Sequence, residues 1–250
     1  MTKTVKGTLS AGGPELHRIA ASAPRKFEVF GERSSGTNLI NLLIRRHTVL
    51  QQSRNLGWKH GFAKMLAIAP DVVVVVCVRN ALPWALSMYA KPWHATPDMQ
   101  RLDFSQFIRA PWQSVIDRPR YFDEACRGAV GQVLQQDRDP VSGACFANLV
   151  KMRNSKTAAL LGFRNRECNL ILVRHETVLE DPAGFLAALN AGFGLPPAAP
   201  YKPVRRRLGS RFKASVELRP PVPDEISAAD RKFILSQLDM TTEAELGYKY

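Results

Sequence analysis

Two glycines separated by four residues, Gly31 and Gly36, mark the stretch of this sequence best suited to chemistry. Glycine lets the backbone approach a ligand closely, and the first N–H groups of a helix point toward a bound anion. The spacing is that of a P-loop, but Thr37 and Asn38 stand where that motif has lysine and serine or threonine. The stretch therefore suits a nucleotide phosphate, without the residues that reach a γ-phosphate and hold magnesium.

The elements that must position this loop are predicted to be a strand before it and a helix after it. Apolar residues fill positions 27–30, and they recur at helical spacing from Thr37 to about Thr48. A second strand is expected over Val72–Val78, which is apolar on both faces, as in a central parallel strand. Strand, helix and strand form a βαβ unit, so the sequence predicts an α/β fold.

The later elements are predicted from the same signals. Helices are expected from near Pro83, from about Ala144 to Leu161, over Ala183–Phe193 and over Ala228–Leu238, and a third apolar strand over Asn169–Val173. Residues 91–136 lack clear periodicity and carry several aromatic side chains. They fit either a segment that holds an acceptor or a pair of irregular helices that cover the sheet.

Two further positions have side chains suited to a reaction on a nucleotide. Lys59 and His60 form a polar pair flanked by glycines, and histidine is the side chain whose pKa best suits a general base. Arg79 follows the second strand directly, and its guanidinium group offers several donors to a phosphate dianion, to which Ser87 adds a hydroxyl. Because the carboxyl ends of parallel strands form the usual ligand crevice, Arg79 is expected beside the glycine loop.

Together these motifs resemble the sulfotransferase family. Its phosphosulfate loop reads roughly Lys-Ser-Gly-Thr-Thr, which Ser35, Gly36 and Thr37 match, with Asn38 in the last place, Ser34 in place of the lysine and Arg33 one residue further out. The resemblance implies a three-layer α/β fold like that of P-loop NTPases, with a central, mostly parallel sheet. It covers about residues 27–250.

The resemblance also implies roles for the second motif. In the family an arginine after the apolar strand and a serine eight residues later bind the 3′-phosphate of the donor, 3′-phosphoadenosine 5′-phosphosulfate, and Arg79 and Ser87 have that spacing. The family's Lys-x-His pair lies in the interval that Lys59 and His60 occupy, although its two residues lie one position further apart. His60 is therefore the candidate base, and Arg33 or Lys59 must supply the cation that the loop lacks.

The carboxyl-terminal half matches the family more loosely. Arg174-His175-Glu176 follows the third strand where the family has Arg-Tyr-Glu, so His175 is interpreted as structural and Glu176 as a positioning hydrogen-bond acceptor. The family closes over the 3′-phosphate with a late basic, glycine-containing loop, and the basic segment with Arg207 and Arg211 is the counterpart here. A charged run of this kind is more commonly only a solvated surface.

Size and charge fit this interpretation without requiring it. The 250 residues, 45% of them hydrophobic, suit one domain over residues 26–250, with residues 1–25 expected to be a flexible arm. No apolar run is long enough for a membrane span, and four widely spaced cysteines indicate the cytoplasm. The formal net charge of +13 indicates an anionic partner.

The function expected from the sequence is sulfuryl transfer to a hydroxyl or amine, with the nucleotide donor as co-substrate and no metal. The acceptor, a carbohydrate or small molecule by first choice, and the oligomeric state are left open. Two alternatives stay open: a nucleotide kinase-like P-loop enzyme, which the missing lysine disfavours, and a non-catalytic basic protein that binds nucleic acid, for which no specific motif is present.

Overall fold

The structure is a computed structural model that describes residues 3–9, 12–19, 21–122, 124–196, 200–204 and 212–250. The chain divides into two compact units. The first comprises residues 1–80, 157–210 and 241–250, and the second comprises residues 81–156 and 211–240. The single domain expected for residues 26–250 stays a prediction, and each unit is described here by itself.

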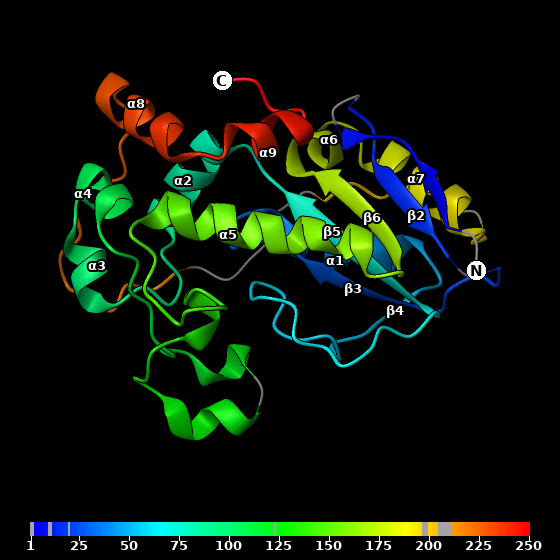
Figure 1. The fold of residues 1–250 in the computed structure, drawn as a ribbon, viewed down its shortest axis with the longest axis horizontal. Coiled ribbons are helices and arrows are strands. Elements are labelled where there is room, and N and C mark those ends of the chain that lie inside the picture. Colours follow the sequence, from blue (N-terminus) through cyan, green and yellow to red (C-terminus); the bar gives the residue numbers. More distant parts are fainter. Residues whose placement is uncertain (1–2, 10–11, 20, 123, 197–199, 205–211) are drawn as a thin grey trace. The chain divides into compact units, whose positions relative to one another are not determined.

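Within the described residues, the first unit contains a six-stranded sheet of order β1-β2-β6-β5-β3-β4 (Figure 1). The strands are β1 Thr4–Lys6, β2 Glu15–Arg18, β3 Lys26–Phe30, β4 Gln51–Gln52, β5 Val72–Val78 and β6 Asn169–Arg174. Strands β6, β5, β3 and β4 run parallel, whereas β1 and β2 are antiparallel additions. The expected α/β class with a mostly parallel sheet is confirmed.

Two hydrophobic cores cover the two faces of this sheet, because successive strand residues point to opposite sides. On one face, Val73, Val75 and Cys77 pack with residues of α1 Thr37–His47 and α7 Pro182–Phe193. On the other face, Val74 and Val76 pack with the end of α5 Leu149–Leu161, with η5 Gly162–Asn165 and with residues after α9 Met240–Glu245. The central strand β5 is buried over its whole length, as its β-branched sequence predicts.

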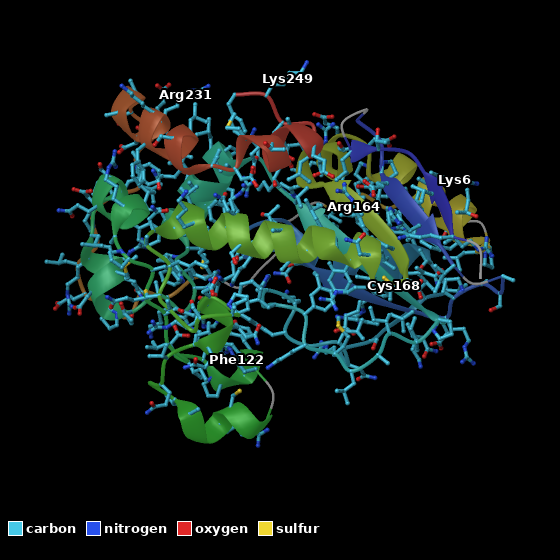
Figure 2. The ribbon with its side chains drawn as sticks, in the orientation of Figure 1. Lys6, Phe122, Arg164, Cys168, Arg231 and Lys249 are labelled. Atoms are coloured by element: carbon cyan, nitrogen blue, oxygen red, sulfur yellow. The ribbon has the colours of Figure 1, made fainter. Side chains whose placement is uncertain are left out.

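The first 25 residues differ from the flexible arm expected above, because they contribute β1 and β2. Leu16 of β2 joins the core, and the flanking Glu15 is buried against Arg164 of η5, whose Nη2 lies 2.7 Å from Glu15 Oε2 (Figure 2). His17 Nε2 lies 2.6 Å from the other carboxylate oxygen. These partners allow a polar sequence to form a buried strand, since a buried charge is tolerated only when it is paired.

The second unit is mainly helical in its described part. It contains α2 Ala81–Ala90, α3 Pro97–Arg101, α4 Phe104–Arg109, the 3₁₀ helices η2 Pro119–Tyr121, η3 Glu124–Ala129 and η4 Gln135–Asp137, the first part of α5, and α8 Ala228–Gln237. Its interior includes a buried ion pair between Lys156 and Asp137, to which Trp112 Nε1 donates at 3.0 Å. The described residues of the irregular segment 91–136 thus form two short α-helices and three 3₁₀ helices, the last of which ends at Asp137.

No helix in the described part of the chain is long and apolar enough to cross a membrane.

Candidate functional site

The glycine loop connects β3 to α1, as the sequence predicts. The loop is folded on itself by the N–H and the hydroxyl of Ser35, which both donate to the carbonyl of Glu32, at 3.1 and 2.6 Å. Gly36 ends the loop with a φ of 95° and precedes the first residue of α1, Thr37. Among the described residues no side chain caps this helix, so its first N–H groups are oriented for an external anion.

Both glycines of the loop are required by close contacts. A Cβ on Gly31 would lie 2.6 Å from the carbonyl oxygen of Cys77, and a Cβ on Gly36 would lie 2.2 Å from Nδ1 of His175. The left-handed φ of Gly36 also disfavours any L side chain there. Gly31 is therefore packed against the end of β5, and Gly36 against His175, the first residue after β6.

Lys59 reaches the helix end of the loop. Its Nζ donates to Oδ1 of Asn38, the second residue of α1, at 2.7 Å. Partial burial, together with the positive charge of Arg54, lowers the pKa of Lys59 to about 8. The segment before it is anchored by Glu28 of β3, whose carboxylate accepts the N–H groups of Asn55 and Leu56 at 2.9 and 3.0 Å. Lys59 thus places a titratable cation beside the start of α1.

His60 lies at the strand end of the same loop. Its Nδ1 lies 2.6 Å from the carbonyl oxygen of Gly31, and the N–H of Gly31 donates to the carbonyl of Lys59 at 3.0 Å. A carbonyl oxygen can only accept, so Nδ1 carries a proton, and in the neutral imidazole Nε2 then holds the lone pair. The ring of Trp58 packs edge-on against the imidazole, with centroids 5.5 Å apart. This tautomer is the one that a base acting through Nε2 requires.

Arg79 contacts the middle of the loop from the carboxyl end of β5. Its Nη1 donates to the carbonyl of Ser34 at 2.8 Å, and Cys77, two residues earlier, directs its thiol to the carbonyl of Ser35 at 2.8 Å. Ser34 has a φ of 65°, a conformation uncommon outside glycine. The strand therefore holds the loop in a defined shape and brings a guanidinium group to its side.

Arg33 is buried, with only 2% of its surface exposed, and its Nε lies 3.1 Å from Oε1 of Glu32. The same oxygen accepts the backbone N–H of Arg33 at 2.7 Å, and the guanidinium group lies 5.7 Å from the centre of the Trp58 ring. Of the two cations considered from the sequence, Arg33 is thus paired inside the protein, whereas Lys59 faces the loop's helix end.

The sequence interpretation gave His175 a structural role, and its ring packs directly on Gly36, a contact that the sequence did not predict. Burial and the nearby charge of Arg79 lower the pKa of His175. The sequence does place His175 directly after β6, and the carboxyl ends of parallel strands lie at one edge of the sheet. This position could have predicted that His175 lies near Gly31 and Arg79. The structure bears out the interpretation of Glu176 as an acceptor: it accepts the N–H of Asn80 and the hydroxyl of Tyr248, both at 3.0 Å.

Three of the predicted site residues are not brought into this cluster by the structure as described. Ser87 lies in α2, in the second unit, so its pairing with Arg79 stays a prediction. Arg207 and Arg211 lie outside the described residues.

The assembled site offers a helix start, the ammonium group of Lys59, the guanidinium group of Arg79 and the imidazole of His60 at one end of parallel strands. Such a set can bind an anion and remove a proton from a neighbouring nucleophile. Within the described residues, no group of three or more His, Cys, Asp or Glu side chains is arranged to hold a metal ion. Comparison with protein-family models, with curated proteins and with solved structures found no match for this chain.

Proposed function

We propose that this protein is a sulfotransferase that moves a sulfuryl group from 3′-phosphoadenosine 5′-phosphosulfate to a hydroxyl or amine. The observation that carries the proposal is the convergence of Lys59, His60 and Arg79 on one loop. From the sequence, His60 is the candidate base, Arg79 the ligand of the 3′-phosphate, and Lys59 one of two candidates, with Arg33, for the cation at the leaving group. The loop also has the sulfotransferase-like Ser35-Gly36-Thr37 sequence.

In this proposal the first unit binds the phosphosulfate end of the donor. The N–H groups at the start of α1, with Thr37 and Asn38, hold the 5′-phosphate, because an uncapped helix end favours negative charge. Arg79 holds the 3′-phosphate through its guanidinium group. Ser87 and the basic segment with Arg207 and Arg211 are predicted to add further contacts to the 3′-phosphate.

The donor supplies an activated sulfuryl group, and the chain supplies proton transfer and charge. His60 removes the acceptor's proton through Nε2 as the new S–O or S–N bond forms. The bond between sulfur and the bridging oxygen of the phosphosulfate breaks, and the negative charge that develops on that oxygen is stabilised by the ammonium group of Lys59. Arg33, paired with Glu32, supports the loop instead.

The proposal is tested by incubating the protein with donor labelled in its sulfuryl group and a panel of carbohydrates, phenols, amines and peptides. Transfer of label to one acceptor class, with equimolar release of 3′-phosphoadenosine 5′-phosphate, is expected. Lys59→Ala should slow this release. The control is Lys249→Ala, at an exposed lysine that has no assigned role in the reaction (Figure 2), and it should leave the rate unchanged. Turnover of ATP with magnesium in place of the donor would favour a kinase-like enzyme instead.

A further inference from the structure

A groove follows the outer edge of the sheet in the first unit, alongside β4. Its lining residues are Lys26, Arg45, Leu50, Gln51, Gln52, Ser53, Arg54 and Asn55. Three of these residues carry a positive charge, and none of the described lining residues is acidic. Arg45 and Arg54 are exposed at the surface. The groove therefore attracts a negatively charged partner.

Among the described residues, no strand pairs with the backbone along this groove on its outer side. Strand β4 is the last strand of the sheet, and the N–H groups of Gln51 and Ser53 donate inward, to the carbonyls of Arg25 and Phe27 at 2.9 and 2.8 Å. In a parallel pair, alternate residues face the neighbouring strand. Gln52, which lies between these two donors, therefore directs its N–H and C=O away from the sheet, toward the groove.

Cations beside an edge strand, such as Arg45 and Arg54 here, have a protective effect, because two copies with like-charged edges repel each other. The same positive charges favour a partner segment that carries negative charge. A segment with alternating carboxylates can pair with Arg45 and Arg54 while its backbone bonds to Gln52. Lys26 of β3 also lines the groove, with 45% of its side chain exposed, and its charge is partly balanced by Asp71 at 3.5 Å.

We propose that the β4 edge binds an extended acidic segment of a partner protein, which adds a strand beside β4. Backbone hydrogen bonds provide the affinity in this type of recognition, and the side chains on either side provide the selectivity. A nucleic acid would satisfy the charge of the groove but not the outward N–H and C=O groups of Gln52. None of the residues assigned to sulfuryl transfer lines this groove, so peptide binding can be measured without that reaction; Arg54 also lowers the pKa of Lys59, so binding and not turnover is the readout.

The first test measures fluorescence anisotropy of a labelled peptide of about eight residues in which Glu alternates with Val. The substitution Arg54→Glu should weaken binding about tenfold, which corresponds to about 1.4 kcal/mol. The control is Lys6→Glu, with the same change of charge on β1 at the opposite edge of the sheet (Figure 2). Equal binding by the wild type and Arg54→Glu, or equal weakening by the two substitutions, would overturn the proposal.

The second test separates strand addition from simple charge attraction. A peptide of the same sequence with alternate residues N-methylated keeps its carboxylates but loses backbone donors on one edge. Two such peptides are made, one methylated at the odd-numbered and the other at the even-numbered residues. The peptide whose methylated residues face β4 should bind at least about tenfold more weakly. If both methylated peptides and a single-stranded oligonucleotide bind as tightly as the parent peptide, the groove is only an anion-attracting surface and the proposal fails.

Discussion

At the scale of single residues, Lys59 is distinguished by an ammonium group that titrates near neutrality. Its pKa is lowered to about 8 by partial burial and by the charge of Arg54. The charge that should stabilise the leaving group is therefore present below pH 8 and lost above it. We expect the rate of the chemical step to fall as the pH rises through about 8.

The substitution Lys59→Arg tests this assignment, because a guanidinium group keeps its charge throughout the accessible pH range. The pH–rate profile of the variant, measured in single turnovers, should lose the decline above pH 8 even if its maximum rate is lower. A decline at an unchanged pH would show that another group causes it.

His60 should act on the rate and not on the affinity for the donor. Loss of a general base costs about 10²- to 10⁴-fold in rate, so His60→Ala should lower turnover by that range. The variant His60→Asn is the matched control, because its amide nitrogen takes the position of Nδ1 and can still donate to the carbonyl of Gly31 but cannot accept a proton. Normal turnover in either variant would remove His60 as the base.

Arg79 should determine the affinity for the 3′-phosphate. Loss of a charge-assisted hydrogen bond costs about 1.5–3 kcal/mol, so Arg79→Ala should weaken binding of 3′-phosphoadenosine 5′-phosphate by about 10- to 100-fold. Calorimetry should show little change for AMP, which has no 3′-phosphate. Substitution of the exposed Arg166 serves as the control. An equal loss for both nucleotides would assign Arg79 to shaping the loop through Ser34.

Much of this residue-level picture could be predicted from the sequence, because local spacing carried the information. Gly31, Gly36 and the pair Lys59–His60 were recognised from their neighbours in the chain. The packing of His175 on Gly36 and the pairing of Arg33 with Glu32 were missed. Both are side-chain contacts that depend on the three-dimensional fold, and no spacing pattern in the sequence predicts them.

At the scale of elements, the loop shape depends on the absence of a side chain at Gly36. The methyl group of an alanine at position 36 would clash with Nδ1 of His175. The alanine backbone would also have to adopt a φ of 95°. We expect Gly36→Ala to lower the free energy of unfolding by about 1–3 kcal/mol, measured by denaturant titration.

A double variant separates the clash from the backbone strain. If the imidazole is the obstacle, adding His175→Ala to Gly36→Ala should restore part of the lost stability, as a non-additive term in a double-mutant cycle. Strictly additive effects would show that the strain at Gly36 accounts for the whole loss.

The regular elements with strong patterns were predicted closely, and those with weak patterns were not. The strand over Val72–Val78 and the helix from Thr37 were confirmed, since their apolar residues follow the period of the element. Strand β4 was missed because two glutamines carry no such signal. The helix expected from about Ala144 begins at Leu149, because Cys145 pairs with Arg138 in a β-bridge and the Oδ1 of Asn148 accepts the N–H of Lys151 at 2.9 Å, as an N-cap does.

At the scale of the whole molecule, the amino-terminal segment was the largest departure from the sequence-based expectation. Glu15 has partners that are distant in sequence, Arg164 and, through Arg164, Glu245 of α9. Burial raises the pKa of Glu15, but the hydrogen bonds from Arg164 and His17 outweigh it and lower the pKa below its ordinary value. The segment is thus held by contacts that composition alone cannot reveal.

This network predicts an acid dependence of stability. A carboxyl group whose pKa is lowered by folding contributes stability above its unfolded pKa, near 4.5, and loses it as the pH falls through the folded value. We expect Glu15→Gln to lose about 1–3 kcal/mol of unfolding free energy at pH 7. Relative to the wild type, this deficit should shrink below pH 4.5. A deficit that is independent of pH would mean that Glu15 acts by packing alone.

The central claim concerns the ligand of the Gly31–Asn38 loop, and calorimetric titration tests it most directly. The wild-type protein is titrated with 3′-phosphoadenosine 5′-phosphate, with AMP and with ATP plus magnesium. We predict micromolar affinity for the first nucleotide and a sharp loss when the 3′-phosphate is absent. Equal binding of all three nucleotides, or binding of none, would contradict the account.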